Sequence, residues 1–334
     1  DVHARCLLQR LHDRSRLFDG QDRLGSALFV VGRDTFQAQL AEDLLRQFED
    51  PRLQQDLSGL AAIAGHLGLD ENQGNIQEKY LKETIKELLR CKQILKDYQV
   101  SRLRVVSTHA LRRAKNRQEI LETIIKETGF EAENISQEEE ANLFFKGVIS
   151  GFDNDKDYAI VDMGGGSVQI LVGNRRELKK AHLMQTGAQY LHDNFTSNPH
   201  SLESFTREED LEKMRGYILE QLLPLKGIGD LPLVYGSSNI IDMMKFIGIP
   251  LEENPGSQTH PYRTYARHLE QFMKEMLPLN YRQREEKFPF QHGYMWGVDK
   301  AFLNIVTMAE HFPSSYIIPS NANLAWGLIY TLAE

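Results

Sequence analysis

The sequence has little cysteine, no long apolar run and no low-complexity tract, and each shortage excludes a class of protein. Its two cysteines, Cys6 and Cys91, lie far apart and outside any CxxC spacing, so neither a disulfide framework nor a cysteine zinc site is expected. No segment approaches the roughly 18 apolar residues of a membrane span, and the first residues are charged where a secretory signal would be apolar. We therefore expect a protein of the reducing cytoplasm.

Positive charge is also in deficit, because 39 Lys and Arg face 47 Asp and Glu and the net charge is -8. This balance argues against broad binding to nucleic acid or to anionic membranes. One segment departs from it, since residues 101–117 carry six basic side chains and no acidic one. That segment is either a solvated helix face or a local site for an anionic ligand.

The order of apolar patterns predicts an α/β protein of more than one domain. A chain of 334 residues is longer than one hydrophobic core usually grows, so two domains are expected. Short β-branched runs alternate with helical periodicity, which is typical of sheets flanked by helices. The polar stretch 151–157 is the expected boundary. We expect strands at 28–31, 103–107, 158–163, 168–172, 177–184, 231–236 and 315–320, helices at 77–98, 110–129, 207–222, 263–277 and 323–333, and turns or caps at Gly129 and Gly173-Asn174.

The stretch VDMGGGSVQI (161–170) places a carboxylate just before three consecutive glycines. Glycines permit tight turns, and they also leave backbone N–H groups uncovered, which suits a phosphate. Asp162 at the strand end is suited to a divalent cation, because hard cations prefer carboxylate oxygen. A strand follows the glycines, and neither GxxxxGK[ST] nor GxGxxG is present, so this is not a P-loop or dinucleotide motif. From spacing alone, a plain turn and a phosphate site remain equal alternatives.

Four segments in order resemble the exopolyphosphatase and guanosine pentaphosphate phosphohydrolase (Ppx/GppA) family of the actin-like ATPase superfamily. They are VVSTHALRRAKN (105–116), ISQEEEANLFFKGV (135–148), IVDMGGGSVQI (160–170) and YGSSNIIDMMK (235–245). The resemblance implies two actin-like (ribonuclease H-like) domains, with mixed sheets flanked by helices and a cleft between them. Domain I is then expected at 1–150, completed by the C-terminal helix 321–334, and domain II at 151–320.

The resemblance also implies roles for individual residues. Glu139 would be the base that activates water, Asp162 would bind Mg²⁺, and Arg112 would contact the phosphate chain. The residues implied to cradle phosphate are Gly164, Gly165, Gly166 and Ser167, then Gly236, Ser237 and Ser238, and in the first hairpin Gly32, Arg33 and Thr35. Structural readings compete with these roles: Ser136 and Glu139 also form the S-x-x-E capping box, and Arg112 could be an exposed helix residue.

Several charged positions of the family pattern are replaced here. Val30 stands where the first hairpin has Asp, Gln37 where it has Arg, and Gln169 removes a carboxylate expected near the metal. Two functions follow as alternatives. The protein is either a metal-assisted hydrolase of polyphosphate or pppGpp, or a catalytically degenerate member that binds a phosphate-rich ligand or a protein partner. A sugar or acetate kinase of the wider superfamily ranks third. The family also suggests a homodimer, for which the sequence identifies no interface.

Overall fold

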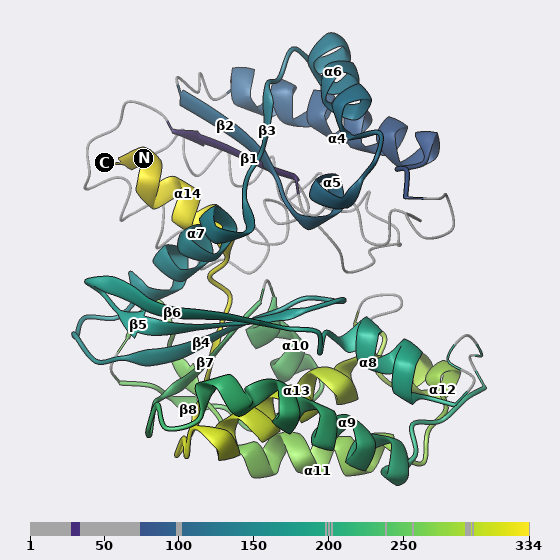
Figure 1. The fold of residues 1–334 in the computed structure, drawn as a ribbon, viewed down its shortest axis with the longest axis vertical. Helices are drawn as coiled ribbons and strands as arrows, with labels where there is room; N and C mark the ends of the chain where they lie inside the picture. The colour runs from purple at the N-terminus through teal and green to yellow at the C-terminus, as the bar shows by residue number, and fades with distance from the viewer. Residues whose placement is uncertain are drawn as a thin grey trace. The chain divides into compact units, whose positions relative to one another are not determined.

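The computed structural model describes residues 28–33, 74–97, 102–197, 199, 201, 203–237, 239–255, 257–290, 295 and 297–333. The described chain divides into two compact units (Figure 1). Unit 1 comprises the described residues up to Glu140 together with those from Leu328 onward, and unit 2 is Ala141–Gly327. The division falls inside the helices α7 (Gln137–Ile149) and α14 (Leu324–Ala333), whereas the sequence-based boundary at 150 lies after α7.

Unit 1 is a three-stranded sheet with helices packed against it. The strands β1 (Leu28–Arg33), β2 (Arg102–Ser107) and β3 (Ala132–Asn134) lie in that order, with β1 antiparallel and β3 parallel to β2. The helices are α4 (Glu78–Asp97), α5 (His109–Arg113) and α6 (Arg117–Thr128). Leu88 and Cys91 on α4 and Ile124 on α6 are buried in one apolar cluster with Val105 of β2. This cluster is the hydrophobic core of the unit.

Unit 2 is built on a five-stranded mixed sheet in the order β10-β7-β4-β5-β6. The two antiparallel pairs β4–β5 and β5–β6 form one edge, and β7 and β10 continue the sheet parallel to β4. The strands are β4 (Tyr158–Met163), β5 (Val168–Asn174), β6 (Glu177–Met184), β7 (Leu233–Gly236) and β10 (Ile317–Ser320), with a separate pair β8 (Glu252–Glu253) and β9 (Tyr262–Arg263). Parallel strands place their carboxyl ends at one edge of the sheet.

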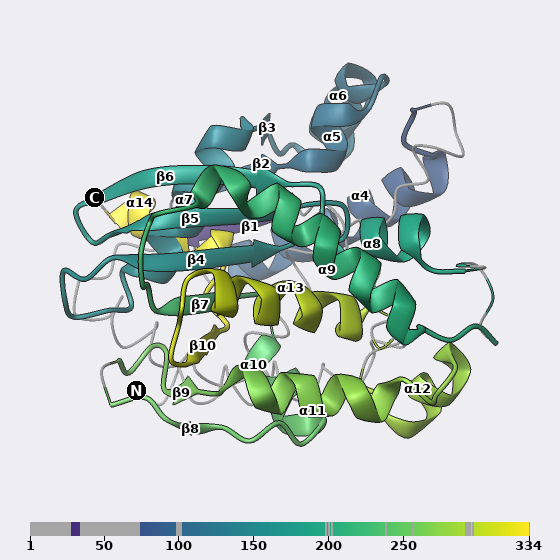
Figure 2. The ribbon, with the colours of Figure 1, turned by 60° about the horizontal axis from the view of Figure 1, so that its bottom comes forward.

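Helices cover both faces of this sheet. Figure 2 shows α9 and α13 across one face, where the odd-numbered residues of β4, such as Val161, enter the main apolar core. The second half of α7 packs on the other face, because a Cβ at Gly236 would lie 2.6 Å from the ring of Phe144. The described helices of the unit besides α7 are α8 (Ala188–Phe195), α9 (Glu208–Leu222), the 3₁₀ turn η2 (Leu223–Leu225), α10 (Ile240–Phe246), α11 (Ala266–Met276), α12 (Tyr281–Lys287), α13 (Val298–His311) and the start of α14.

Two local predictions are corrected. The helix expected at 110–129 is two helices, because the chain breaks at 114–116, where the side chain of Asn116 is held by the backbone of Ile76. The turn expected at Gly173-Asn174 lies at 175–176, since β5 runs on through Asn174, whose side-chain oxygen accepts the Arg176 amide. The C-cap at Gly129 is confirmed by its left-handed φ of 74°.

No helix in the part of the chain that the structure describes is both long and apolar enough to cross a bilayer.

Candidate functional site

Three side-by-side residues mark the carboxyl edge of the parallel strands in unit 2. Asp162 of β4 pairs in register with Gly236 of β7, and Gly236 pairs with Ser320 of β10. Alternation along β4 puts Asp162 on the face opposite Val161, which is the face that α7 covers. Ligands of open α/β sheets characteristically bind beyond this edge. The sequence thus folds its predicted carboxylate and its two small-residue turns onto one edge.

The glycine turn is a short hairpin between β4 and β5 that leaves backbone donors without a partner among the described residues. It is closed by one bond, from the Gly164 amide to the Ser167 carbonyl at 3.0 Å. The amides of Gly165, Gly166 and Ser167 have no hydrogen bond to another described residue. Gly166 is exposed, and a Cβ there would meet no atom within 4 Å. Adjacent amides of this kind suit an anion with several oxygens.

The turn after β7 leads into a helix whose first turn carries a carboxylate that the sequence analysis missed. The Ser237 amide donates to the Ser320 carbonyl at 3.1 Å, and Asn239 adopts a left-handed φ of 64°. Asp242, on the first turn of α10, is half-buried, and burial raises the pKa of its carboxyl. Its contact with Asn321, on the loop after β10, joins residues 79 apart in sequence, so no local pattern signalled it.

In unit 1, Glu139 is held in an ion pair at the start of α7. Its carboxylate accepts from Arg104 of β2 at 2.5 Å, and Arg104 also contacts Glu133. The Glu139 amide donates to the Ser136 hydroxyl at 3.0 Å, so Ser136 caps the helix as its capping-box pattern predicts. The Glu139 side chain is 41% exposed. Half of the capping box therefore forms, and the glutamate side chain is directed to Arg104.

The neighbouring glutamate has a different environment. Glu140 accepts from Arg112 at 2.5 Å, and the two side chains are only 15% and 20% exposed. Burial raises the pKa of Glu140, and the charge of Arg112 and a hydrogen bond from Thr108 oppose that shift. Arg112 also donates to the Ile135 carbonyl at 3.0 Å. Arg112 is therefore not a solvated helix residue but one half of a partly buried carboxylate–guanidinium pair.

The remaining predicted residues lie at the border of the described chain. Gly32 and Arg33 are the last residues of β1, opposite Leu103 and Arg102 of β2. The predicted Thr35 and Ser238 lie outside the described residues, as does Gln37, whose replacement of an arginine the sequence analysis noted.

The side chains at the end of β4 determine whether a metal ion could bind there. Within the described ranges, no group of three or more His, Cys, Asp or Glu side chains could hold a metal ion. Gln169 lies directly opposite Asp162 in the β4–β5 ladder, so that cross-strand position supplies an amide in place of a second carboxylate. One carboxylate nevertheless fits Mg²⁺, which is commonly bound by one or two carboxylates together with substrate phosphates and water.

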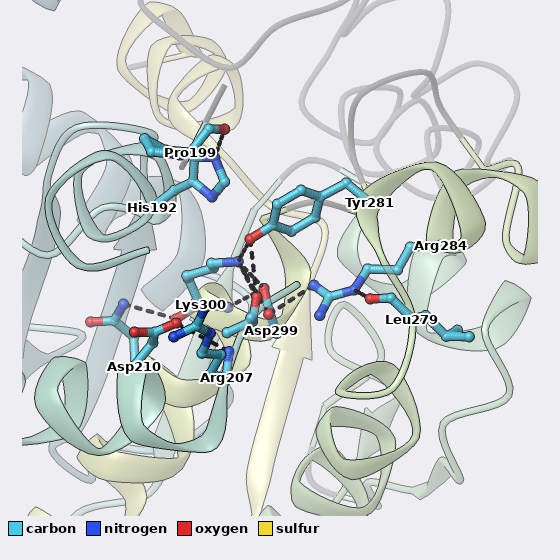
Figure 3. A network of polar contacts seen from close by, with 11 residues as sticks. His192, Pro199, Arg207, Asp210, Leu279, Tyr281, Arg284, Asp299 and Lys300 are labelled. Atoms are coloured by element: carbon cyan, nitrogen blue, oxygen red, sulfur yellow. Dashed lines mark hydrogen bonds and ion pairs between the residues drawn. The ribbon is translucent and has the colours of Figure 1, made fainter. Parts of the chain in front are cut away.

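Unit 2 also contains a buried ionic cluster that no sequence pattern predicted (Figure 3). Asp299 on α13 is bonded to Arg284 of α12 at 2.8 Å and to Lys300 at 2.9 Å, and all three side chains are at most 1% exposed. Lys300 also donates to Thr206 at 2.8 Å and to the Tyr281 hydroxyl at 3.3 Å. Although burial acts in the opposite direction, the two cations hold the pKa of Asp299 well below its usual range.

Comparison with known proteins identifies the family of this chain. Residues 66–334 match the Ppx/GppA phosphatase family. The chain belongs to that family. Two of the similar solved structures are the Aquifex aeolicus PPX-GPPA enzyme (TM-score 0.68, 20% identity, 79% of this chain and 86% of that chain) and an exopolyphosphatase from Cytophaga hutchinsonii (TM-score 0.65, 23% identity, 78% and 84%). The expected mixed α/β fold of the family is thereby confirmed.

One similar curated protein is named for two activities. The bifunctional 3-dehydroquinate synthase/phosphatase of Fusobacterium nucleatum subsp. nucleatum is 30% identical over 165 residues, which are 48% of this chain. The match spans 24% of that protein's length.

Proposed function

We propose that the protein hydrolyses the terminal phosphoanhydride bond of polyphosphate or of a guanosine polyphosphate. Water would attack the terminal phosphorus, the bridging P–O bond would break, and orthophosphate and a shortened chain would leave. The observation that carries the proposal is the glycine turn of a Ppx/GppA chain, with unpartnered amides at Gly165 and Gly166 beside the Asp162 edge in the part of the chain that the structure describes. Phosphoryl transfer needs mainly positioning and charge neutralisation, so few groups suffice.

Each unit, taken by itself, holds groups that suit this chemistry. In unit 2 the turn amides would hold terminal phosphate oxygens, and Asp162 would hold Mg²⁺, which when bound supplies positive charge to the phosphate oxygens. In unit 1 the pair of Arg112 and Glu140 combines a cation suited to phosphate with a carboxylate.

Two residues, Glu139 and Glu140, are candidates for the base that takes the proton from water. Family position favoured Glu139, yet that side chain is half-exposed and paired with Arg104. Glu140 is partly buried with its pKa raised by desolvation, and a carboxylate whose pKa moves toward neutrality is the better general base. We therefore propose Glu140 for this role and Glu139 as the orienting partner of Arg104.

The two glutamates form a matched pair for the experiment. Orthophosphate release would be measured from tripolyphosphate, long-chain polyphosphate and pppGpp, with Mg²⁺, for wild type, Glu139→Gln and Glu140→Gln. Loss of a general base lowers kcat by roughly 100-fold to 10,000-fold, which we expect for Glu140→Gln. Glu139→Gln should lose less than about tenfold, because it removes a half-exposed ion pair. The reverse order of the two variants would return the base to Glu139.

The second candidate function is binding without hydrolysis, and Gln169 opposite Asp162 favours it. Isothermal titration of tripolyphosphate and pppGpp, with and without Mg²⁺, separates the two. Tight binding with no phosphate released by wild type would establish the binding protein and end the hydrolase proposal.

A further inference from the structure

The glycine turn is held from behind by the first residues of α8. The Ala188 amide donates to the Gly164 carbonyl at 3.3 Å, and the Tyr190 amide donates to the Gly165 carbonyl at 3.0 Å. The described chain has no cis peptide bond, so in each planar unit the N–H points opposite to the carbonyl of the preceding residue. The N–H groups of Gly165 and Gly166 are therefore directed away from α8.

This arrangement turns an otherwise adaptable loop into a pair of fixed donors. Three consecutive glycines have the widest choice of backbone conformations, and nothing in the described hairpin beyond the single Gly164–Ser167 bond fixes the orientation of its two middle peptides. The two bonds from α8 supply that orientation. They also satisfy helix N-terminal amides that have no partner within α8.

We infer that the N-terminus of α8 is the positioning element of the phosphate turn, and that Gly187 and Asn304 are the positioning residues that keep it there. The inference rests on the proposed function, because it assigns the Gly165 and Gly166 amides to a phosphate. It adds residues that lie outside the four segments of family resemblance.

Gly187 permits the close approach of α8 to the turn. A Cβ at this position would lie 2.5 Å from the carbonyl carbons of both Gly165 and Gly166, which is far inside van der Waals contact with backbone. The φ of Gly187 is -56°, an angle open to every residue, so the requirement is for space alone. An alanine at this position would adopt the same backbone angles and force the two backbones apart.

Asn304 anchors the chain just before Gly187. Its side-chain amide donates to the Thr186 carbonyl at 2.7 Å and to the Lys300 carbonyl at 3.1 Å, and the residue is fully buried on α13. At the other end of α8 the ring of His192 meets the Tyr281 ring edge-on, with centroids 5.1 Å apart (Figure 3). Both ends of α8 are thus fixed to the α12–α13 layer.

The test uses two variants and a control for each. Gly187→Ala is matched by Gly216→Ala, the same change in α9 at an exposed position where a Cβ meets nothing within 4 Å. Asn304→Leu is matched by Thr307→Val, which removes another buried polar group from α13 without touching the α8 loop. Melting temperature and circular dichroism identify any variant that fails to fold.

The direct readout is the amide resonances of Gly165 and Gly166 in [¹⁵N]glycine-labelled protein, titrated with inorganic phosphate. In wild type and both controls these two signals should shift together with saturation. In Gly187→Ala the phosphate Kd should rise at least about tenfold, the effect of one lost hydrogen bond to a charged group. In folded Asn304→Leu the phosphate Kd should also rise. Its KM for tripolyphosphate should rise by a larger factor than its kcat falls.

Each outcome has one meaning. If folded Gly187→Ala binds phosphate as wild type does, or if the two glycine signals do not respond to phosphate in wild type, the inference is overturned. If wild type shows the glycine shifts and Gly187→Ala loses them, yet no substrate is hydrolysed, the inference stands and the proposed hydrolysis fails. If wild type hydrolyses tripolyphosphate and Gly187→Ala matches its kcat/KM, the proposed function stands without this positioning element. A loss of about 100-fold in kcat/KM for Gly187→Ala supports both.

Discussion

Replacing Asp299 by Asn would leave two buried cations without their carboxylate. Arg284 and Lys300 are both fully buried, and Asp299 is the carboxylate that both contact. Removing one partner of a buried ion pair costs about 3–5 kcal/mol, because the remaining charge cannot return to water.

The wild-type carboxylate also makes stability depend on pH. Burial would raise the pKa of Asp299, but the two cations hold that pKa below its value in the unfolded chain, so the unfolded state takes up a proton first as the pH falls. The contribution of Asp299 to the free energy of unfolding is therefore complete above about pH 4 and is lost in stronger acid, and Asp299→Asn should lack that acid-dependent loss.

Urea and thermal unfolding at pH values from about 3 to about 7 measure both effects. A loss of 3–5 kcal/mol corresponds to a fall in melting temperature of roughly 6–20 °C for a domain of this size. The control is Asp155→Asn, the same change in the exposed pair with Arg176, which should cost less than about 1 kcal/mol. A change in Asp299→Asn that is below about 1 kcal/mol and independent of pH would refute the reasoning about the buried cluster.

Two further predictions concern stability. Gly236→Ala places a Cβ 2.6 Å from the Phe144 ring and should lower the free energy of unfolding by about 1–3 kcal/mol in urea, while an unchanged midpoint would mean that the ring moves freely. His260 is fully buried with its Nε2 donating to the Val148 carbonyl, and burial lowers its pKa to about 4. Its neutral form stabilises the fold above pH 6.5, and stability is lost as the pH falls toward 4, by about 3 kcal/mol in total. His260→Gln should flatten that part of the pH profile, measured by thermal unfolding, and a profile as steep as that of wild type would contradict the assignment.

Local patterns succeeded where short-range chemistry decides the structure. The helix at 78–97, the strand at 177–184 and the cap at Gly129 depend on periodicity and on one glycine conformation, which neighbouring residues reveal. They failed where a distant group intervenes. The break before α6 depends on the contact between Asn116 and Ile76, 40 residues away. The helices α8 and α13 were missed, because no helical periodicity was assigned to those residues from the sequence.

The candidate site divides in the same way. The sequence predicts Asp162 and the glycines as site residues, because a carboxylate beside three glycines between two apolar runs is unusual in itself. Family resemblance assigns the base to Glu139. The different surroundings of Glu139 and Glu140 could not be predicted, since adjacent glutamates on one helix look alike until β2 and α5 place Arg104 beside one and Arg112 beside the other.

Residue order was enough to establish the family, the alternation of strands and helices, and the turn that offers its amides, because these depend on the succession of residue types along the chain. Three-dimensional packing was needed to show which of the two glutamates is the less exposed, which way the turn amides point, and that Asp299 lies between two cations. Burial, charge pairing and peptide orientation depend on groups that are brought together from separate segments, and free energy is set by those neighbours in space.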